Sequence, residues 1–289
     1  MNSSHIDETL PVVDHGVVGK LRIASLQPSV TVTLADLGEL GQLVACTKYC
    51  AEVCPEVVSA GKKIIQDSWT AKADEIIDSK PDLVIASVPY QKEAVAQIIK
   101  AGARFLGLAP RCLADVYEDI RMIARVTGAA VRGEQVIREM QWAVNEIRRA
   151  TVFYPKMRVF CEEWGKPLIH SQRWVAELVE AAGGTFIGEP GAQTTSEAIR
   201  VMDPEVVIAS WCGAGDRVPL EKIVHDRGWL NTSAGKNERV FCVSDELLNT
   251  PATTLVGGLR ALAWAMHPER FEKPIGVRRI DEERAQKAG

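Results

Sequence analysis

The sequence predicts an α/β protein built from two Rossmann-like lobes with mainly parallel sheets, joined by a single long α-helix. Three observations support this fold class. One stretch of the chain is repeated with few changes, short apolar runs alternate with helical segments, and a long amphipathic stretch separates the two halves. Together they indicate two similar units and not one continuous sheet.

The repeated stretch covers residues 81–87 (PDLVIAS) and 204–210 (PEVVIAS). Each copy follows a helical segment and leads into a loop with an aromatic residue, Tyr90 in the first copy and Trp211 in the second. An apolar run without polar alternation is typical of a strand buried on both faces, as in parallel sheets covered by helices. Because open α/β sheets bind ligands at the carboxyl ends of their strands, the repeat predicts a cleft with one aromatic wall from each lobe.

Strands and helices alternate in βαβ order in both halves of the chain. In the first half the predicted strands span residues 21–26, 43–47, 82–87 and 104–108, with helices at 30–40, 71–79 and 91–101. In the second half the predicted strands span residues 158–161, 185–187, 206–210 and 240–243, with helices at 174–182, 195–202, 219–225 and 253–266.

The segment between the halves predicts a long connecting helix. Ile120 and Ile123 begin an amphipathic stripe, and apolar residues continue it at spacings of three and four from Val136 to Ile147. Residues 135–150 contain neither glycine nor proline, so a helix of about 16 residues, about 24 Å long, is expected there. Such a helix would act as a spacer that resists wide opening of the lobes. The alternative is a crossover helix packed on one lobe.

These elements divide the chain of 289 residues, which is long enough for two lobes that each have a core. The tail is expected to fray from Asp281. The expected parts are a polar leader at 1–20, an N-terminal lobe at 21–115, a linker helix at 116–150, a C-terminal lobe at 151–270 and a charged tail at 271–289.

Composition excludes several partners and activities. The hydrophobic fraction of 46% and the charged fraction of 25% are those of a soluble globular protein. The formal net charge is -4 and the basic residues are interspersed with acids, so no concentrated basic surface for nucleic acid is expected. No run approaches about 18 apolar residues, so no membrane-spanning helix is predicted. No G-x-G-x-x-G, P-loop or Ser-His-Asp arrangement supports an enzyme.

The amino terminus and the cysteines bear on location. Residues 1–20 are polar and acidic and lack the basic start, apolar core and small-residue cleavage site of a secretory signal. The seven cysteines are odd in number and scattered in spacing, which makes a poor disulfide framework. A cytoplasmic location is therefore expected for the chain as written. The alternative is a periplasmic or cell-surface location after removal of a leader.

Aromatic residues near strand ends predict the walls of a ligand cleft. Trp164 falls near the end of the first strand of the second half, Trp211 ends the repeated strand, and Tyr49 and Tyr90 face it from the first half. Flat aromatic walls offer a macrocycle a large apolar contact with little loss of side-chain entropy. Two further tryptophans lie on helical stripes and are expected in the core, Trp142 and Trp264.

Cysteine and histidine residues raise the question of a metal site. Cys46, Cys50 and Cys54 are spaced C-x3-C-x3-C, and thiolates bind soft metals and iron–sulfur clusters. This spacing matches no common zinc signature, and Cys46 lies in an apolar strand that points its sulfur into the core. The imidazole of His170, on the loop ahead of a helix, suits an axial position on haem or cobalt. A capping or solvent-exposed histidine is the alternative.

Gln27, Pro28 and Ser29 open a helix at the end of the first predicted strand. Backbone N–H groups at a helix start attract anions, so these residues are predicted to contact a polar or anionic substituent of the ligand. Ordinary N-capping by Ser29 is the alternative, and the two roles are compatible.

Several motifs together resemble one known family. Residues 22–29 (RIASLQPS) resemble its opening strand and the turn into its first helix, and residues 80–85 resemble its KPDLVI signature. Residues 177–184 resemble the helix and double glycine of its second lobe. From about residue 21 to residue 267 the chain resembles the helix-hinged (class III) periplasmic-binding-protein family. These are ABC transporter substrate-binding proteins for cobalamin, haem and ferric siderophores, and the cobalamin-binding members are the nearest likeness.

The resemblance implies a corrinoid as the ligand, with haem or a ferric siderophore as alternatives, and no required cofactor. It also places Trp69 and Asn249 near the ligand. It places the loop at residues 47–55 beside the ligand, so Cys50 becomes a predicted ligand contact. Cys50 and Cys54 on this loop, together with His170, become weak candidates for ligation of the ligand's metal.

The resemblance also implies a membrane partner. Glu93 and Glu221 lie near the positions from which transporter-coupled relatives present one carboxylate per lobe to arginines of an ABC permease. Docking of this kind requires that the protein be exported. For a cytoplasmic protein these glutamates are solvated helix residues.

The function expected from the sequence is that of a non-catalytic carrier or sensor, which holds a corrinoid or other metal chelate for transport, salvage or sensing. An alternative of another class is a metal-cluster enzyme or scaffold of nitrogenase-like architecture that uses the cleft cysteines. A third is a cytoplasmic regulatory binder whose partner is another protein.

Overall fold

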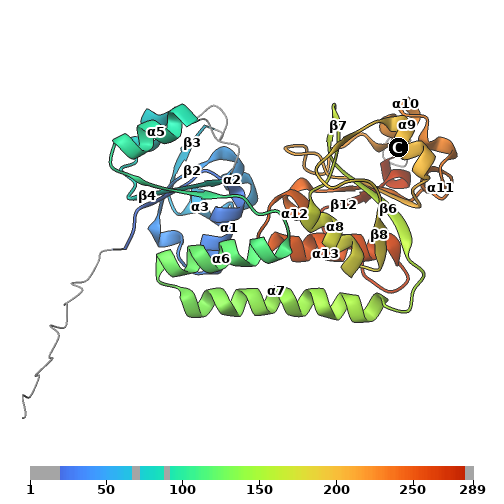
Figure 1. The fold of residues 1–289 in the computed structure, drawn as a ribbon, viewed down its shortest axis with the longest axis horizontal. Helices are drawn as coiled ribbons and strands as arrows, with labels where there is room; N and C mark the ends of the chain where they lie inside the picture. The colour runs from blue at the N-terminus through green and yellow to red at the C-terminus, as the bar shows by residue number, and fades with distance from the viewer. Residues whose placement is uncertain (1–19, 67–71, 88–91, 284–289) are drawn as a thin grey trace, which may run out of the picture.

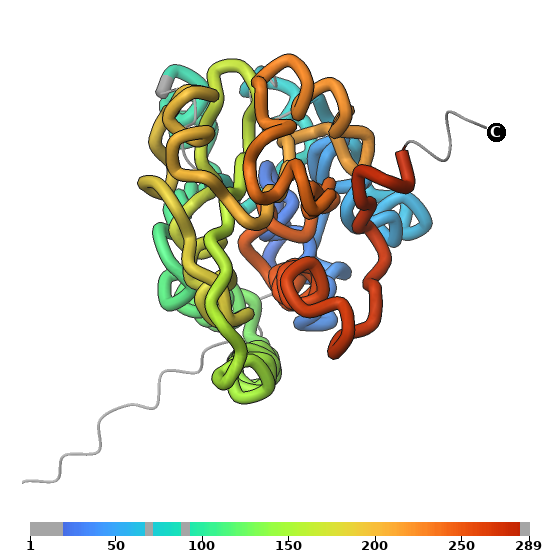
Figure 2. Tube along the Cα trace, turned by 90° about the vertical axis from the view of Figure 1, so that its right-hand side faces the viewer, coloured from blue at the N-terminus to red at the C-terminus, as the bar shows by residue number. Residues whose placement is uncertain are grey.

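The computed structural model describes residues 20–66, 72–87 and 92–283, and it shows two α/β lobes side by side above a long helix (Figure 1). Each lobe has its own sheet, so the predicted fold class is confirmed. The long helix, α7 (Ala130–Thr151), lies at one end of the body and is seen end-on in Figure 2.

The N-terminal lobe carries a five-stranded, fully parallel sheet in the order β3-β2-β1-β4-β5. Its strands are β1 (Ile23–Ser25), β2 (Leu43–Thr47), β3 (Lys63–Ile65), β4 (Leu83–Ser87) and β5 (Arg104–Leu108). Its helices are α1 (Pro28–Asp36), the 3-10 helix η1 (Leu40–Gln42), α2 (Lys48–Val53), α3 (Glu56–Ser59), α4 (Ala73–Ile77) and α5 (Lys92–Lys100). The strand order reverses between β1 and β4, and ligands of open α/β sheets bind at such a point.

The C-terminal lobe carries a mixed sheet in the order β12-β11-β10-β6-β7-β9, with β8 also paired to β6. Its strands are β6 (Met157–Gly165), β7 (Leu168–His170), β8 (Gly184–Phe186), β9 (Gln193–Thr194), β10 (Val206–Ala209), β11 (Val240–Val243) and β12 (Val277–Arg279). Its helices are α8 (Arg173–Ala181), α9 (Ser196–Met202), α10 (Leu220–Asp226), η2 (Trp229–Asn231), α11 (Ser233–Lys236), α12 (Asp245–Asn249) and α13 (Thr254–Met266). Three of these strands, β7, β9 and β12, are antiparallel to their neighbours and were not predicted.

The repeated stretch forms the same structure in both lobes. β4 pairs in parallel with β1, and β10 pairs in parallel with β6. The acid of each copy accepts a hydrogen bond from a backbone N–H on that neighbouring strand: Asp82 from Arg22 at 2.9 Å, and Glu205 from Arg158 at 3.0 Å. Each of these arginines also donates to a backbone carbonyl just ahead of the repeat. The sequence repeat is thus a repeat of structure.

Two successive helices connect the lobes. Helix α6 (Leu113–Thr127) ends at Gly128, which has a left-handed φ of 81° and caps the helix. Helix α7 begins at Ala130, earlier than predicted, and includes Gly133. A Cβ on Gly133 would lie 2.4 Å from the Cβ of Ala124, so only glycine allows α6 and α7 to pack this closely. At 1.5 Å per residue, the 22 residues of α7 extend about 33 Å.

The connecting helices pack unequally on the two lobes. The apolar stripe of α7, from Val136 to Ile147, belongs to the core that also contains β6, α8 and α13 of the C-terminal lobe. Ile123 and Ala124 of α6 belong instead to the core of the N-terminal lobe. The helix pair therefore fixes the lobes to each other, with α7 anchored on the second lobe.

The predictions for two tryptophans and for the tail had mixed outcomes. Trp142 was expected in the core but is 63% exposed, because it lies off the apolar stripe of α7 that packs in the core of the C-terminal lobe. Trp264 does pack against the core. Part of the expected charged tail is ordered: β12 pairs with β11, and Glu283 accepts a hydrogen bond from Arg278 at 3.0 Å. No described helix combines the length and apolarity needed to cross a bilayer.

A direct hydrogen bond joins the two lobes at their base. Thr253, which precedes α13, donates its hydroxyl to Asp36 Oδ2 at the end of α1, at a distance of 2.5 Å. Arg132 of α7 donates to the backbone carbonyl of Asp36 at 2.9 Å, so all three parts of the body meet here. Burial raises the pKa of Asp36, and the hydrogen bond from Thr253 and the charge of Arg132 oppose that rise.

Replacing Thr253 by valine is expected to lower the free energy of unfolding by about 1–3 kcal/mol, because the partly buried Asp36 carboxylate loses its donor. The native state binds the Asp36 proton more tightly than the unfolded chain does. The contribution of Asp36 to the free energy of unfolding therefore falls as pH rises through the raised pKa. Because the hydrogen bond from Thr253 matters most when Asp36 is charged, the loss of stability in Thr253→Val should shrink at acidic pH.

Urea unfolding at several pH values measures this effect. The matched control is Thr185→Val on the exposed part of β8, for which a change within about 0.5 kcal/mol is expected. Equal stabilities of wild type and Thr253→Val at neutral pH would contradict the proposed role of this contact.

Candidate ligand pocket

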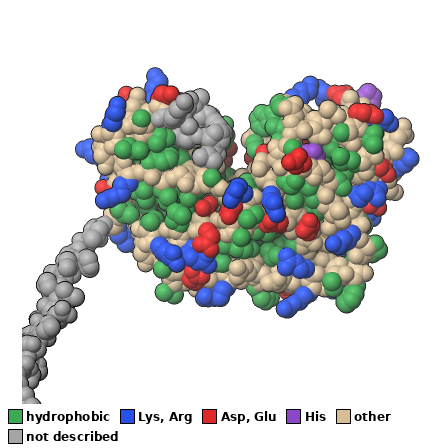
Figure 3. Space-filling view, in the orientation of Figure 1, with side chains coloured by type: hydrophobic (Ala, Val, Ile, Leu, Met, Phe, Trp, Pro, Cys, Tyr) green, Lys and Arg blue, Asp and Glu red, His purple; other side chains and the backbone are tan. Residues whose placement is uncertain are grey.

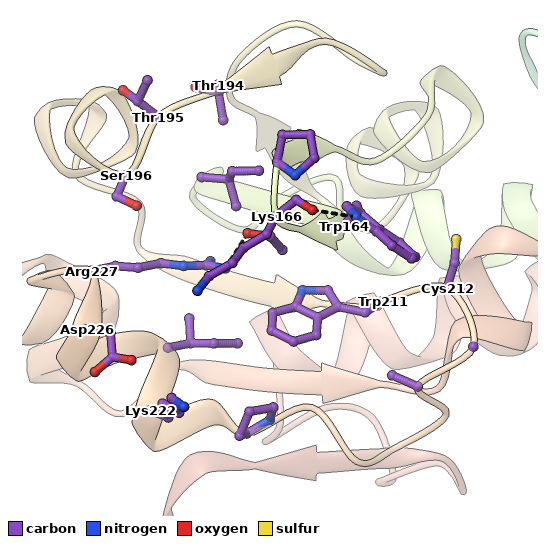
Figure 4. A pocket seen from close by; sticks show the side chains of 17 residues that line it. Trp164, Lys166, Thr194, Thr195, Ser196, Trp211, Cys212, Lys222, Asp226 and Arg227 are labelled. Carbon is purple, nitrogen blue, oxygen red and sulfur yellow. Dashed lines mark hydrogen bonds between the residues drawn. The ribbon is translucent and has the colours of Figure 1, made fainter.

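A pocket of about 810 Å³ lies at the carboxyl ends of β6 and β10 in the C-terminal lobe. It is lined by the turn after β6, by the segment that follows β10, by residues 194–196, and by α10 together with Arg227. Figure 4 shows these side chains around the cavity. The two strands are neighbours and parallel, so their carboxyl ends present both loops at one edge of the sheet. The space-filling view shows a notch between the lobes with hydrophobic side chains on the C-terminal lobe's side (Figure 3).

Two tryptophans form the aromatic part of this pocket. Trp164 is 43% exposed, and its indole N–H donates to the backbone carbonyl of Lys166 at 2.8 Å. Trp211 is half-buried, and its indole N–H donates to Glu162 Oε1 at 2.8 Å. A Cβ on Gly165 would lie 2.5 Å from Cζ2 of Trp211, so this glycine lets the indole lie flat against the β6 backbone. Both indoles are thus held in place before any ligand arrives.

A buried ion pair lies beneath the tryptophans. The side chain of Glu162 is fully buried, and Arg227 donates to its Oε2 at 2.6 Å. The Arg227 guanidinium also lies over two indoles, 4.9 Å from the ring centre of Trp229 and 5.9 Å from that of Trp211. Burial raises the pKa of Glu162, and the charge of Arg227 and the hydrogen bonds from Trp211 and Arg227 oppose that rise.

Asn249 and Cys212 lie beside the segment that carries Trp211. Asn249 at the end of α12 donates to the carbonyl of Ser210 at 2.7 Å and is 3.4 Å from the sulfur of Cys212. Asn249 therefore fixes the start of the Trp211 segment. Partial desolvation, with the carboxylates of Glu163 and Asp245 nearby, raises the pKa of Cys212 to about 12. Cys212 is a neutral thiol at neutral pH.

The N-terminal lobe presents part of its predicted site at the corresponding edge. Gln27 and Pro28 are half-buried at the end of β1, where Gln27 is the N-cap of α1 and makes no side-chain capping bond. Ser29 was considered as an N-cap but lies inside the helix and is buried, and it accepts a hydrogen bond from Thr33. Tyr49 is half-buried on α2 after the end of β2. The remaining predicted contacts of this side, Trp69 and Tyr90, lie outside the described residues.

The structure contradicts the predicted roles of Cys50 and Cys54. Residues 48–53 form a helix and not an open loop, and Cys50 is buried with no exposed surface in the core of the N-terminal lobe. Burial alone would raise the pKa of Cys50, but hydrogen bonds with Cys46, Thr31 and Thr47 lower it. Cys54 is also buried, and its thiol donates to Glu56 at 3.3 Å.

His170 was predicted on the loop ahead of a helix but belongs to β7. Its ring is buried between Phe160 and Phe186, at centroid distances of 5.3 and 6.1 Å. Its Nδ1 is 3.1 Å from the carbonyl oxygen of Ala192, and Gly188 closes over its Nε2. This ring cannot reach a ligand metal. Among the described residues, no group of three or more His, Cys, Asp or Glu side chains is arranged to hold a metal ion, which gives no support to a metal-cluster enzyme.

The predicted docking residues lie at the same end of the two lobes. Glu93 is exposed on α5, and Glu221 is half-exposed on α10. Figure 1 places α5 and α10 at the end opposite α7, on either side of the gap between the lobes.

Sequence reasoning missed five charged residues of the pocket region. These are Glu162, Lys166, Lys222, Asp226 and Arg227. A signal for Glu162 existed, because the apolar run of β6 continues directly into two glutamates and a tryptophan. A carboxylate next to a buried strand requires a cation nearby. The sequence did not reveal that this cation lies 65 residues further on.

Comparisons with known proteins agree with this architecture. A family model described as "Periplasmic binding protein" matches residues 23–247. The chain is 24% identical over 265 residues to an uncharacterised ABC transporter substrate-binding lipoprotein, YvrC, of Bacillus subtilis, covering 87% of this chain and 82% of that protein.

Two solved structures share the fold at low sequence identity. A periplasmic haem-binding protein from Pseudomonas aeruginosa has a TM-score of 0.78 at 18% identity, with 90% of this chain and 98% of that chain covered. The periplasmic vitamin B12 binding protein BtuF of Vibrio cholerae has a TM-score of 0.69 at 20% identity, with 86% and 97% covered.

The buried ion pair gives a stability prediction. Arg227→Gln is expected to lower the free energy of unfolding by about 3–5 kcal/mol, because it leaves the Glu162 charge buried without a partner. The loss should shrink as pH falls, since a protonated Glu162 needs no counter-charge. Glu162→Gln combined with Arg227→Gln should recover part of the loss at neutral pH.

Thermal or urea unfolding of these variants provides the measurement. Arg200→Gln, which breaks an exposed pair with Glu197, is the matched control and should cost less than about 1 kcal/mol. A single Arg227→Gln variant as stable as wild type would refute the structural role of the pair.

Proposed function

Because this chain belongs to the periplasmic binding protein family, we propose that it is the substrate-binding protein of an ABC transporter and holds a bulky metal chelate between its lobes. The family is one of substrate-binding proteins, so the chain is a binding protein and not an enzyme, as the sequence predicted. The proposed ligand is a corrinoid of the cobalamin type, with haem or a ferric siderophore as alternatives.

The observation that carries this proposal is the rigid aromatic wall made by Trp164 and Trp211. The two indoles are fixed by hydrogen bonds to Lys166 and Glu162, and they stand at the sheet edge where α/β proteins bind ligands. A large flat ligand gains apolar contact on such a wall without ordering the side chains first. The fold relatives named for vitamin B12 and haem are consistent with a ligand of this shape.

The chemistry of the described pocket favours a chelate whose metal is already fully coordinated. Haem iron is held by a histidine, cysteine, methionine or tyrosine side chain. Of these residue types, only Cys212 lines the pocket among the described residues, and its pKa is raised to about 12. His170 is enclosed in the sheet. A corrinoid carries its metal in a ring with its own axial groups and needs no such ligand.

The connection between the lobes supports a largely preformed site. Helix α7 is anchored in the C-terminal core, and the hydrogen bond between Thr253 and Asp36 joins the lobes at their base. Wide hinge motion would break both sets of contacts. We therefore expect ligand binding with little closure.

Location and partner follow from the same proposal. A substrate-binding protein of an importer works on the outer side of the membrane, and the Bacillus subtilis relative is named a lipoprotein. We therefore favour an extracytoplasmic location over the cytoplasmic one suggested by composition. Glu93 and Glu221, one on each lobe at the end opposite α7, are the proposed contacts with the permease.

Calorimetric titration with cyanocobalamin, cobinamide, haem and a ferric siderophore tests the ligand. Micromolar or tighter binding of cyanocobalamin is expected. Trp164→Ala and Trp211→Ala should each weaken binding about 10- to 100-fold, since aromatic anchors at the centre of a site contribute about 1.5–3 kcal/mol. Trp142→Ala, at an exposed position of α7, is the control and should leave affinity unchanged. Flat titrations with all four compounds would reject the proposal.

Charge reversal at the proposed docking residues tests the partner. Glu93→Arg together with Glu221→Arg should abolish most ligand uptake in cells that carry the cognate permease, because like charges then face its arginines. Ligand affinity of the purified double variant should match wild type. Glu269→Arg is the control, because Glu269 is exposed. Glu205→Arg would be unsuitable, because Glu205 pairs with Arg158. Unchanged uptake by the double variant would exclude these two residues as docking contacts.

A further inference from the structure

The pocket gathers three cations, of which only Arg227 is paired with a carboxylate, Glu162. Lys166 comes from the turn after β6, Lys222 from α10, and Arg227 follows that helix. Among the described residues, no carboxylate lies within ion-pair distance of Lys166 or Lys222. Asp226 is the one acidic side chain among the described lining residues, and it is mostly exposed. In Figure 4 the Lys166 and Arg227 side chains both extend into the middle of the cavity.

Arg227 has donors to spare after it binds Glu162. A guanidinium carries five N–H groups in a planar fork. One is used on Glu162 at 2.6 Å, and the only other bond described is a long one of 3.4 Å to the carbonyl of Gly165. The side chain is 12% exposed and lies over the indole of Trp229, so its place in the pocket is fixed.

The walls of the pocket strengthen the hydrogen bonds to an anion bound at this position. The indoles of Trp164 and Trp211 form an apolar wall of the pocket, and a ligand that covers them would leave less water around a charge-assisted hydrogen bond, which strengthens the bond. Arg227 is already paired with Glu162, so Lys166 brings a positive charge that no described carboxylate balances. A carboxylate or phosphate balances this charge and accepts hydrogen bonds from both groups.

We propose that this pocket binds an anionic substituent, a carboxylate or a phosphate, carried by the metal chelate in the cleft. Arg227 and Lys166 are its direct partners, Lys222 stands at the rim, and Glu162 is a positioning residue that holds Arg227 in the cavity. This inference rests on the proposed function, and it adds that the ligand is recognised through a negative charge on its periphery.

The anion has two possible sources with the same chemistry. A corrinoid with its nucleotide tail carries a phosphate, and a porphyrin carries carboxylates at its edge. Paired ligands that differ in the anionic group distinguish these sources. The pairs are cyanocobalamin against dicyanocobinamide, which lacks the phosphate, and haemin against its dimethyl ester, in which the carboxylates are blocked.

Calorimetric titration of the full chain with both pairs tests the inference. In the pair that binds, removal of the anion should weaken binding to the wild type by about 10- to 100-fold, equivalent to one or two charge-assisted contacts. Lys166→Gln should weaken binding of the anionic member about 5- to 20-fold and leave that of the neutral member unchanged. The double variant Glu162→Gln with Arg227→Gln should likewise weaken binding of the anionic member and leave that of the neutral member unchanged. It leaves no buried charge without a partner.

Arg270→Gln is the matched control, because Arg270 is exposed and lies outside the pocket lining. It should change neither affinity by more than about twofold. The inference would be overturned if the neutral and anionic members bound the wild type equally. It would also be overturned if Lys166→Gln weakened binding of both members equally. Either result would leave the proposed function intact. Failure of all four ligands, and of a ferric siderophore titrated beside them, to bind would overturn both.

Discussion

The pairing of Glu162 with Arg227 organises the binding edge of the C-terminal lobe. Burying the two charges costs several kcal/mol each, and their attraction offsets this only where the geometry is good and the remaining polar atoms are bonded. Here one carboxylate oxygen accepts from Arg227 and the other from Trp211. The same carboxylate therefore sets the angle of an aromatic wall and the position of a cation. An apolar residue at position 162 would pack in the sheet, but the Trp211 indole and the Arg227 guanidinium would lose the carboxylate that positions them.

The two lobes start from one plan and diverge at the pocket edge of the second sheet. The repeated strand occupies the same place in both sheets, and even the acid that binds a neighbouring backbone N–H is retained as Asp82 and Glu205. The N-terminal sheet stays fully parallel, whereas β6 of the second sheet continues into an antiparallel hairpin with β7. That hairpin supplies Trp164 and Lys166, so the departure from the repeated plan builds the pocket.

The sequence predicted what depends on local pattern and missed what depends on distant contacts. Apolar runs located most of the central strands, and the position of Trp211 at a strand end placed it in the pocket. Periodicity did identify the stripe of α7 that packs in the core, but Trp142 lies off that stripe and was wrongly assigned to it. Burial of His170 depends on Phe160, Phe186 and the return of Gly188, none of which a local pattern reveals. The same limit explains why Arg227 was missed.

A preformed site changes how such a protein can discriminate between ligands. If the lobes closed widely, the free energy of closure would add to binding and tune affinity for any bulky guest. The base contact between Asp36 and Thr253 and the anchoring of α7 in one core both resist that motion. Discrimination must then come from groups fixed in the walls before binding. The indoles accept many flat ligands equally, since stacking is tolerant of chemistry. The charged groups beside them are selective, because Arg227 and Lys166 together carry one positive charge more than Glu162 balances. Selectivity in this protein is therefore expected to depend on Arg227 and Lys166 more than on the tryptophans.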